Sequence, residues 1–385
     1  MITKQKHLYK NNLKLWNKFG SCTFFFVIFF CHLLRQSYGF KVAVFGGSGF
    51  IGRRICEVLI KSGDCEVCSI SKSGKPPAYY CDNSWADKIE WISYDFAKEM
   101  ESPTEEENID LGTIDAAISC VGNMNPCLEW KQLFGLGFDN DKLMVQNGEW
   151  NERICELSKN SGAQNFVFMS VNYETSKAFE GPIPGYIYGK RRAESKACEL
   201  FGPDKTFVLG LPPIVYGGNR FKKLGDIFRQ LVESSIAKRY VGTNDFLRSL
   251  SSAPMEDWLE KMIFSSPVLV ENVARVACIC AFGNISKDIV GPRKQGFFDT
   301  DGKPVFYDDV VFIDGTDAIE ELSSNDKNLP YPLEPEQKDG APDFEGALVG
   351  QHPWLYPIPV AGVFGTIFWA VATQQFVQVD SNISV

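Results

Sequence analysis

Histidine is scarce in this chain of 385 residues. It has three histidines, His7, His32 and His352, and none of them lies between residues 33 and 351. Ser-His-Asp triads, HExxH zinc sites and acid–base catalysis by histidine are therefore excluded from the central part of the chain. Any chemistry there has to use Tyr, Lys, Ser, Cys or carboxylate side chains.

Acidic residues are missing from the first 39 positions, although the whole chain has a net charge of −9. This leader carries six basic residues, so the remainder of the chain has a net charge of −15. Because so acidic a body repels phosphate backbones, we expect no nucleic-acid partner. Hydrophobic residues at 44% and charged residues at 23% are close to globular averages. The length allows one large α/β domain with appendages, or two domains.

No cysteine follows Cys280, and most of those between residues 40 and 280 lie in apolar runs typical of buried strands and helices. This placement favours reduced thiols. Cys65 and Cys68 have the spacing of a redox CxxC motif, but residues i and i+3 of a strand face opposite sides. We therefore expect neither a disulfide nor a metal site there.

Residues 1–39 have the features of a targeting signal. Lysines precede a short apolar run at 22–34, and the small residues Ser37 and Gly39 suit signal-peptidase cleavage before Phe40. The run is short for a bilayer span, and a retained membrane anchor is the alternative. A signal peptide combined with reduced thiols favours an organelle reached by the secretory route, such as a complex plastid, with the mitochondrion as the alternative.

From Phe40 onward, short β-branched runs alternate with helical stretches. This pattern predicts the α/β class, with a Rossmann-type doubly wound parallel sheet. The predicted strands are residues 41–45, 66–70, 90–94, 116–120, 165–169 and 206–209. Helices are predicted at 51–61 and 148–159, and a small, largely helical substrate-side region at 220–266.

The composition changes after about residue 285. Residues 299–345 contain fourteen acidic residues and three lysines, so we expect 286–345 to form a solvated acidic arm. The apolar C-terminal tail, 346–385, includes 24 uncharged residues at 356–379. A membrane span, an interfacial or partner-docking helix and packing in the core are the alternatives for it. The remaining divisions are the leader at 1–39 and a nucleotide-binding domain at 40–285.

A glycine motif follows the first predicted strand. Gly46, Gly49 and Gly52 have the spacing GxxGxxG and lead into a predicted helix. Gly46 permits a tight turn, Gly49 lets the backbone approach a pyrophosphate, and Gly52 lets helix and strand pack closely. The helix N-terminus attracts the anion. At the first strand–helix junction of a βαβ unit, this motif predicts dinucleotide binding. The alternative is an ordinary glycine-rich turn without a ligand.

The second predicted strand ends at Ser71-Lys72-Ser73, where an NAD-selective site carries Asp or Glu. No carboxylate is present, and hydroxyl groups with Lys72 and either Arg53 or Arg54 could bind a 2′-phosphate. The sequence therefore favours NADP over NAD. Asp95, after the third strand, would contact the adenine or cap a helix.

Tyr186 and Lys190 form a YxxxK motif at the start of a predicted helix, where positions i and i+4 share one face. A phenol with a pKa of about 10 must ionise to relay a proton, and an adjacent ammonium helps. Tyr188 has Arg192 at the same spacing, but arginine cannot shuttle a proton. The alternative interpretation is a surface Tyr–Lys pair.

These motifs resemble the atypical, extended type of short-chain dehydrogenase/reductase. Within that superfamily the chain is most similar to the branch with the nucleotide-binding accessory subunit of respiratory complex I, the yeast reductase-like protein of coenzyme Q biosynthesis, and related plastid proteins. The segments that carry the resemblance are FGGSGFIGRRIC (45–56), SISKSGKP (69–76), GYIYGKRRAE (185–194) and PVLVENVA (267–274). They cover about residues 40–285.

The resemblance implies roles for individual residues. Tyr186 would be the acid/base, and Lys190 would bind the nicotinamide ribose and tune Tyr186. Asn147 matches a structural Asn before a long helix, and Ser170 the substrate-orienting hydroxyl. The chain departs from the family after Ser170, where Val171 replaces a further serine, and at Leu211, which replaces an arginine.

Two hypotheses follow for the function. The first is an NADP(H)-dependent oxidoreductase acting on a small hydrophobic, quinone- or isoprenoid-like substrate at an organellar membrane. The alternative is a non-catalytic nucleotide-binding accessory subunit or assembly factor, docked to a membrane complex through its tail. A sugar-nucleotide epimerase ranks third, because no basic cluster for a second diphosphate is evident. The expected cofactor-binding residues are Gly46, Ser48, Gly49, Phe50, Ile51, Gly52, Arg53, Ser71, Lys72, Asp95, Val121 and Lys190.

Overall fold

A computed structural model of the chain describes most of the segment between Gly39 and Pro330. The described residues are 39–63, 65–76, 83–101, 109–122, 139–181, 183–218, 222–235, 265–285, 297–298, 304–305, 310–326 and 329–330. The predicted targeting signal before Gly39 and the whole apolar tail lie outside them, as does much of the predicted acidic arm.

Seven strands form one sheet, with the order β11-β6-β5-β4-β1-β2-β3. The strands are β1 (Phe40–Phe45), β2 (Cys65–Ser71), β3 (Glu90–Ser93), β4 (Ala116–Ser119), β5 (Asn165–Val171), β6 (Thr206–Leu211) and β11 (Val311–Asp314). The pairs β1–β4, β2–β3, β4–β5, β5–β6 and β6–β11 are parallel. The predicted doubly wound parallel sheet is confirmed, as are the six predicted strands.

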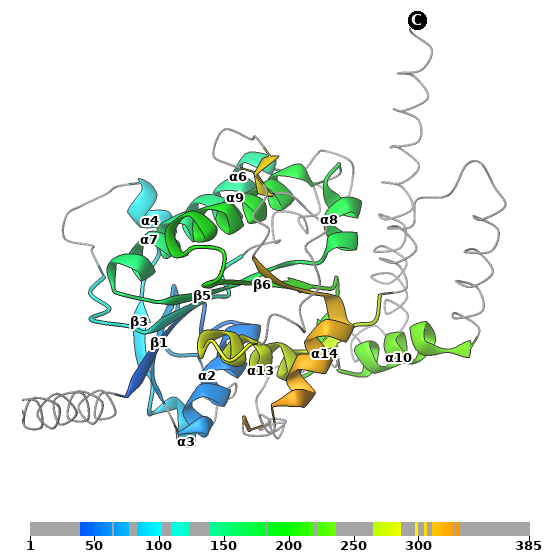
Figure 1. Cartoon of the computed structure of the whole chain (residues 1–385), viewed down its shortest axis with the longest axis horizontal. Coiled ribbons are helices and arrows are strands. Elements are labelled where there is room, and N and C mark those ends of the chain that lie inside the picture. Colours follow the sequence, from blue (N-terminus) through cyan, green and yellow to red (C-terminus); the bar gives the residue numbers. More distant parts are fainter. Residues whose placement is uncertain are drawn as a thin grey trace, which may run out of the picture. The chain divides into compact units, whose positions relative to one another are not determined.

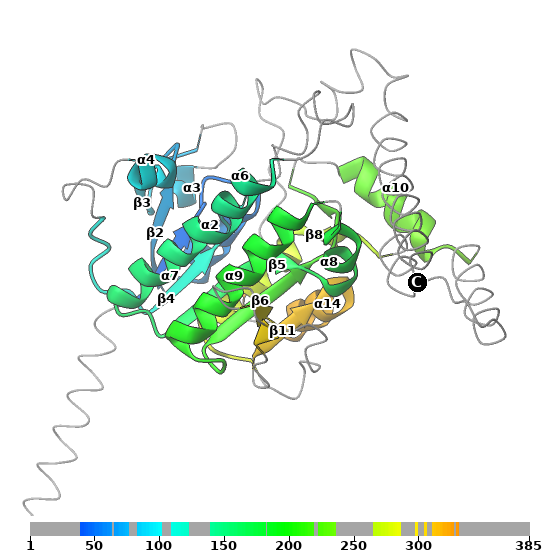
Figure 2. The same ribbon diagram turned by 90° about the horizontal axis from the view of Figure 1, so that it is seen from above.

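Helices cover both faces of the sheet (Figures 1 and 2). On one face α2 packs against α13, and α13 packs against α14; on the other, α9 packs against α6, η3 and α7. Their bounds are α2 (Phe50–Ser62), α13 (Val270–Ala281), α14 (Gly315–Asn325), α6 (Asn140–Met144), the π-helical turn η3 (Val145–Glu149), α7 (Trp150–Asn160) and α9 (Pro184–Phe201). Both helices predicted from the sequence are present.

The shorter elements lie around this framework. They are the helices α3 (Asn83–Ala86), α4 (Phe96–Glu101), α8 (Tyr173–Phe179) and α10 (Lys222–Glu233) and the strands β7 (Val215–Tyr216), β8 (Val268–Leu269), β9 (Phe297–Phe298) and β10 (Pro304–Val305). β7 pairs with β8 in parallel, and β9 pairs with β10 in antiparallel.

The core explains why the central strands form. Residues 42–45 of β1, Val-Ala-Val-Phe, are fully buried, and β5 and β6 are buried over almost their whole length. Continuous apolar runs of this kind are typical of parallel strands covered on both faces. Phe45, Phe166, Phe168 and Phe201 belong to one buried cluster, in which Phe166 stacks on Phe201.

The predicted solvated acidic arm is wrong for its middle part. Residues 311–314 form β11, the seventh strand, which pairs with β6, and α14 packs against α13. Three apolar residues, Val311-Phe-Ile313, are buried here, although acidic residues surround them in the sequence. Arg275 of α13 fixes the end of α14 by donating to the backbone carbonyl oxygens of Ser323 and Asp326.

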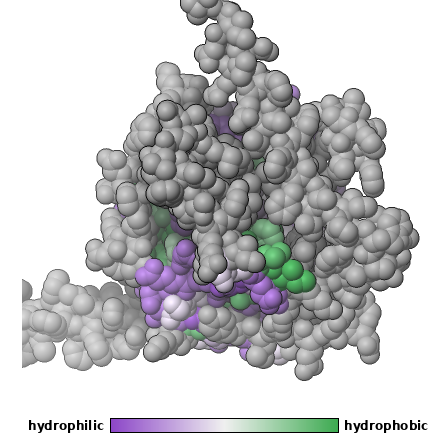
Figure 3. All heavy atoms as spheres, turned by 90° about the vertical axis from the view of Figure 1, so that its right-hand side faces the viewer, coloured by the Kyte–Doolittle hydropathy of each residue, from purple (hydrophilic) through white to green (hydrophobic). Residues whose placement is uncertain are grey.

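The predicted substrate-side region contains α10, which confirms a helix at 222–233, whereas residues 236–264 lie outside the described part. On the side of the molecule that carries α10, hydrophobic and hydrophilic side chains adjoin at the surface (Figure 3). No helix within the described ranges has the length and apolar character needed to cross a membrane.

Candidate functional site

A candidate cofactor site lies where the strand order reverses, between β1 and β4. The chain leaves β1 toward β2 on one side, whereas β4 leads to β5 on the other. Ligands of open α/β sheets bind at the carboxyl ends of such strands. Gly46 follows β1 with a φ of +79°, and a Cβ there would lie 3.2 Å from the carbonyl carbon of Cys120. The glycine turn and the segment after β4 are therefore in contact.

The glycine turn is tightly packed in the way its motif predicts. The amide of Gly49 donates to the carbonyl of Gly46 at 2.9 Å. A Cβ on Gly52 would lie 2.2 Å from that same oxygen. Gly49 is the N-cap of α2 and offers no side-chain cap, and the first turn of the helix contains no acidic residue. The first amides of α2 are thus suited to binding a phosphate.

The two arginines of α2 differ in their surroundings. Arg53 is buried, and its guanidinium lies 5.7 Å from the ring centroid of Phe50, while Ile51 beside it is half-buried. Arg54 donates to Glu57 at 2.7 Å and lies 3.9 Å from Glu271 of α13. Because Arg54 belongs to this buried ion cluster, it is not placed to bind a 2′-phosphate.

Hydroxyl groups and one exposed lysine gather after β2. Ser48 of the glycine turn lies 2.8 Å from Ser73, oxygen to oxygen, and Ser71 donates to the carbonyl of Gly74 at 3.0 Å. The Lys72 side chain is 79% exposed, and its ammonium lies 2.9 Å from Asp95. Asp95 also accepts from the amide of Ala97 in α4, which is the helix-capping alternative for this residue.

Tyr186 is buried rather than on the surface. It lies in the first turn of α9 and belongs to a small apolar cluster with Leu143 and Ile187, against which Val171 and Phe179 pack. The alternative of a surface Tyr–Lys pair is therefore wrong. The apolar surroundings provide a setting from which water is largely excluded.

Lys190 connects α9 with the ends of two strands. Its ammonium donates to the carbonyl oxygens of Met169 in β5 at 2.9 Å and of Val121 after β4 at 3.3 Å. The side chain is 5% exposed, and burial lowers the pKa of Lys190 to about 8, against the opposing effect of Glu194. Lys190 is thus still protonated at neutral pH, and the burial of its charge lowers the stability of the folded state.

Asn147 lies in the π-helical turn η3 and is fully buried. Its side-chain amide donates to the carbonyl of Leu143, and its own carbonyl accepts from Asn151. A Cβ added at Gly122 would meet both the Lys190 ammonium, at 2.8 Å, and the Asn147 side-chain oxygen, at 3.1 Å. Asn147, Lys190 and the segment after β4 therefore lie close together. The π-helical turn that holds Asn147 is an irregularity frequently found at functional sites.

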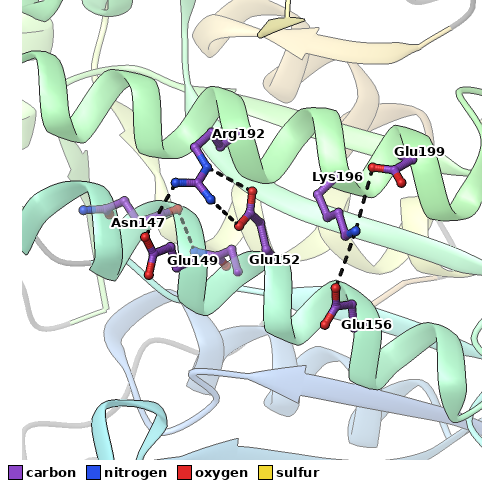
Figure 4. Close-up of polar contacts among 8 residues, drawn as sticks. Asn147, Glu149, Glu152, Glu156, Arg192, Lys196 and Glu199 are labelled. Atoms are coloured by element: carbon purple, nitrogen blue, oxygen red, sulfur yellow. Dashed lines mark hydrogen bonds and ion pairs between the residues drawn. The ribbon is translucent and has the colours of Figure 1, made fainter. Parts of the chain in front are cut away.

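Ion pairs hold α9 against α7 (Figure 4). Arg192 makes two hydrogen bonds to Glu152 of α7, at 3.0 and 2.7 Å. Lys196 lies 3.4 Å from Glu156 and 3.8 Å from Glu199. Arg192 therefore belongs to the packing between helices, in agreement with its exclusion from proton transfer.

Ser170 and Val171 end β5, and both contact the region of α9. Ser170 is buried and donates to the carboxylate of Glu194, whereas its neighbour Val171 packs against the Tyr186 cluster. Side chains alternate along a strand, so Ser170 shares its face of β5 with Phe166 and Phe168, which cluster with Ala193 and Ala197 of α9. The sequence interpretation also missed Glu194, although its spacing of four residues from Lys190 was a visible signal.

The eight described cysteines are free thiols. Cys65 and Cys68 donate to different carbonyl oxygens, those of Leu59 and Val42. Burial raises the pKa of Cys56, among others, well above that of an ordinary thiol. Within the described ranges, no group of three or more His, Cys, Asp or Glu residues is arranged to hold a metal ion.

Some solved structures are similar to the chain at low identity. UDP-glucuronic acid 4-epimerase from Bacillus cereus, in complex with NAD, is 19% identical with a TM-score of 0.34 over 50% of this chain and 64% of the epimerase. The chain thus spans less than two thirds of that enzyme. WbmG from Bordetella bronchiseptica, in complex with NAD, is 11% identical with a TM-score of 0.39 over 78% and 93% of the two chains.

Curated proteins are more similar in sequence, although no protein-family model matches. The chain is 30% identical over 235 residues to the uncharacterized chloroplastic protein At1g32220 of Arabidopsis thaliana, covering 61% of this chain and 69% of the relative. It is 42% identical over 266 residues to MIOREX complex component 2 of Saccharomyces cerevisiae, covering 53% and 92%. By these identities the chain belongs to the protein family that includes At1g32220 and MIOREX complex component 2.

Proposed function

We propose that the chain is an NADP(H)-dependent oxidoreductase of the extended short-chain dehydrogenase type. The observation that carries the proposal is the buried Lys190 ammonium, bonded to Val121 after β4 and one helical turn from Tyr186. The glycine turn contacts the same segment after β4. A dinucleotide bound along this path would reach from α2 to the Tyr–Lys pair.

The residues present fit the cofactor. The cradle of Gly46, Gly49 and Gly52 and the uncapped first turn of α2 would hold the pyrophosphate. Lys72, whose ammonium is paired with Asp95 at 2.9 Å, would bind a 2′-phosphate together with the hydroxyl groups of Ser48 and Ser73, and β2 itself ends without a carboxylate. Lys190 would bind the nicotinamide ribose. When bound, the nicotinamide supplies or accepts a hydride.

Tyr186 would move the proton in this reaction. Its hydroxyl would donate a proton to the substrate oxygen during reduction and accept one from it during oxidation, with Lys190 one turn away on the same helix. Leu143, Val171 and Phe179 surround Tyr186 with apolar surface. This lining supports a small hydrophobic substrate, since it offers hydrocarbon contacts and excludes water.

Val171 favours a second candidate, a nucleotide-binding accessory subunit or assembly factor without turnover. It offers no hydrogen bond at the position beside Tyr186. The yeast relative is named as a component of a complex. A bound nucleotide would then act as a structural ligand, contributing about 3 kcal/mol to folding stability at a hundredfold excess over Kd.

We further propose that the protein works in an organelle. The leader has a signal-like pattern, and the Arabidopsis relative is named as chloroplastic, which supports a plastid over the mitochondrion. Contact with a membrane or a membrane complex through the apolar tail belongs to the same proposal.

A fluorescence titration of the full chain with NADPH and with NADH tests cofactor binding. We expect NADPH to bind at least about tenfold more tightly, which corresponds to about 1.4 kcal/mol. Lys72→Ala should abolish this difference while leaving NADH binding unchanged. If the folded protein binds neither nucleotide, both candidate functions fail.

The two candidates separate on turnover. With hydrophobic carbonyl compounds and quinones as trial substrates, an oxidoreductase consumes NADPH, and Tyr186→Phe abolishes consumption while NADPH binding persists. An accessory subunit binds NADPH, shows no consumption, and gives the same result with Tyr186→Phe. Unchanged turnover in Tyr186→Phe would contradict the proposed role of the tyrosine.

A further inference from the structure

A buried polar network joins α7 to the end of β4. Asn151 of α7 and Ser119 of β4 are both fully buried. The hydroxyl of Ser119 donates to the side-chain oxygen of Asn151 at 2.6 Å, and the amide of Val121 donates to the Ser119 hydroxyl at 3.4 Å. The side-chain nitrogen of Asn151 donates to the carbonyl oxygens of Val121 at 3.3 Å and of Asn147 at 3.0 Å. The network therefore fixes both the amide and the carbonyl of Val121.

The side chain of Asn151 fits this network in only one orientation. Its nitrogen has two N–H donors, and both point to carbonyl oxygens, which can only accept. A flipped amide would place its oxygen against these two carbonyl oxygens, and a buried polar group without a partner costs free energy. Asn151 therefore sets the position of the Val121 carbonyl relative to the π-helical turn that holds Asn147.

Lys190 shares the carbonyl of Val121 with Asn151. The ammonium donates to that oxygen at 3.3 Å and to the carbonyl oxygen of Met169 at 2.9 Å. Because an ammonium has three N–H donors, two fixed acceptors determine the direction of the third. Gly122, the residue after Val121, is exposed, and a Cβ there would lie 2.8 Å from the ammonium nitrogen. A shift of the Val121 carbonyl would therefore turn the ammonium beside an exposed part of the chain.

We propose that Asn151, supported by Ser119, is a positioning residue of the cofactor site, which holds the Val121 carbonyl so that Lys190 directs its third N–H at the nicotinamide ribose. The proposal rests on the oxidoreductase function proposed above. A neutral amide suits this task, since it holds a carbonyl oxygen without changing the charge beside the buried ammonium. Asn151 is fully buried, so it acts on the cofactor through Lys190.

Two nucleotides of different reach test the proposal, by isothermal titration calorimetry of the full chain. NADPH reaches Lys190 in the proposed site, whereas adenosine 2′,5′-bisphosphate lacks the nicotinamide ribose and ends at the glycine turn. Asn151→Ala should bind NADPH about tenfold more weakly, because a hydrogen bond to a charged donor is disturbed. The variant should bind the bisphosphate as the wild type does, whereas a general loss of structure would weaken the binding of both nucleotides.

Asn165→Ala is the matched control. Asn165 is also buried, and its side-chain nitrogen donates to the carbonyl oxygen of Ala281 at 2.9 Å, but it begins β5, at the end of the strand away from the site. Since each variant loses a buried amide, both should unfold at a lower urea concentration than the wild type. Only Asn151→Ala should lose NADPH affinity.

Ser119→Ala is a smaller change that gives the same readout if Asn151→Ala does not fold. It removes the hydroxyl that orients the Asn151 amide, so NADPH should bind about threefold more weakly and the bisphosphate with unchanged affinity. Ser158→Ala is its control, because Ser158 is a buried hydroxyl of the same helix α7 that donates to the carbonyl of Ile154. The control should bind both nucleotides as the wild type does.

A double-mutant cycle tests whether Asn151 acts through Lys190. Lys190→Met should weaken NADPH binding, and Asn151→Ala added to it should cause no further loss. Additive losses, an equal loss of affinity for both nucleotides, or unchanged NADPH affinity in Asn151→Ala and Ser119→Ala would overturn the inference and leave the proposed function in place. If the wild type binds neither NADPH nor the bisphosphate, the proposed function fails, and the inference fails with it.

Discussion

The hydroxyl of Ser170 donates a hydrogen bond to the carboxylate of Glu194. Both side chains are buried, and Glu194 lies one turn beyond Lys190 on α9. Burial lowers the pKa of Lys190, and the charge of Glu194 acts in the opposite direction. Ser170 is therefore part of the support for a carboxylate that helps keep Lys190 protonated, and Glu194 acts on the site through Lys190 as a positioning residue.

Replacing this carboxylate should change the pH dependence of nucleotide binding. In Glu194→Gln the pKa of Lys190 should fall below about 8, because the neighbouring negative charge is gone. NADPH affinity should then begin to weaken at a lower pH than in the wild type, as the ammonium loses its proton. Titrations from neutral to alkaline pH measure the midpoint. Glu194→Asp keeps the negative charge, so its midpoint should lie close to that of the wild type. Identical midpoints in all three proteins would contradict the role of Glu194.

The buried ammonium also predicts a pH-dependent stability. The pKa of Lys190 is about 8 in the folded chain and about 10.4 in the unfolded one. Between these values the unfolded state binds more protons, so the free energy of unfolding rises with pH, and the cost of the ammonium is fully present below pH 8. The rise from this one group amounts to about 3 kcal/mol.

Urea unfolding of the wild type and of Lys190→Met, near neutral pH and at alkaline pH, isolates this contribution. The wild type should gain stability relative to the variant as the pH rises. Buried thiols such as Cys56, whose pKa is raised, give the opposite slope and cancel in the difference because they are present in both proteins. Cys120 is the exception, since burial raises its pKa but the charge of Lys190 lowers it. Parallel pH profiles for the two proteins would show that Lys190 is not desolvated as described.

Local sequence patterns were enough to predict the sheet and the glycine turn. Fully buried parallel strands require continuous apolar runs such as Val42-Ala-Val-Phe45, and these runs are visible without knowledge of their partners. The turn at Gly46 is a local steric requirement of the backbone. The Tyr186–Lys190 spacing likewise depends only on the helix period.

Features that depend on distant contacts could not be predicted in this way. β11 is four residues long and surrounded by acidic residues, and what stabilises it is the pairing with β6, about a hundred residues away in sequence. The bond between Ser170 and Glu194 joins residues 24 positions apart in the sequence, so it depends on how α9 packs on β5. Arg53 and Arg54 are adjacent and chemically identical in the sequence, and they differ through distant contacts such as that of Arg54 with Glu271 of α13.

Gly52 in the first turn of α2 and Gly63, the C-cap of that helix, allow a matched test of the nucleotide cradle. In Gly52→Ala the new Cβ would meet the backbone oxygen of Gly46 at 2.2 Å, which neither residue can avoid without moving the turn. We expect loss of measurable NADPH binding and about 3 kcal/mol of destabilisation.

Gly63, at the other end of the helix, has a φ of +77° and open space around it. Gly63→Ala should cost about 1 kcal/mol and leave NADPH binding intact. Equal NADPH affinity in both variants would argue against the glycine turn as the site.

The position of Val171 beside Tyr186 predicts a gain of function. Val171→Ser would place a hydroxyl where the structure has an aliphatic side chain packed against the tyrosine cluster. Under the oxidoreductase proposal this hydroxyl adds a hydrogen bond to the oxygen that receives the proton from Tyr186. Single donors to such oxygens contribute on the order of a hundredfold to turnover, and an imperfectly placed one should still raise turnover by about tenfold.

Val171→Ala is the control for this experiment, because it removes the same methyl groups without adding a hydroxyl. Both variants should lose similar stability, about 1 kcal/mol, and keep the NADPH affinity of the wild type. Steady-state NADPH consumption with a hydrophobic carbonyl substrate then separates them, and only the serine variant should exceed the wild type. If serine and alanine give the same rate, position 171 does not face the reacting oxygen. If neither they nor the wild type consume NADPH although all three bind it, the missing hydroxyl is not what limits turnover, and the accessory-subunit candidate gains support.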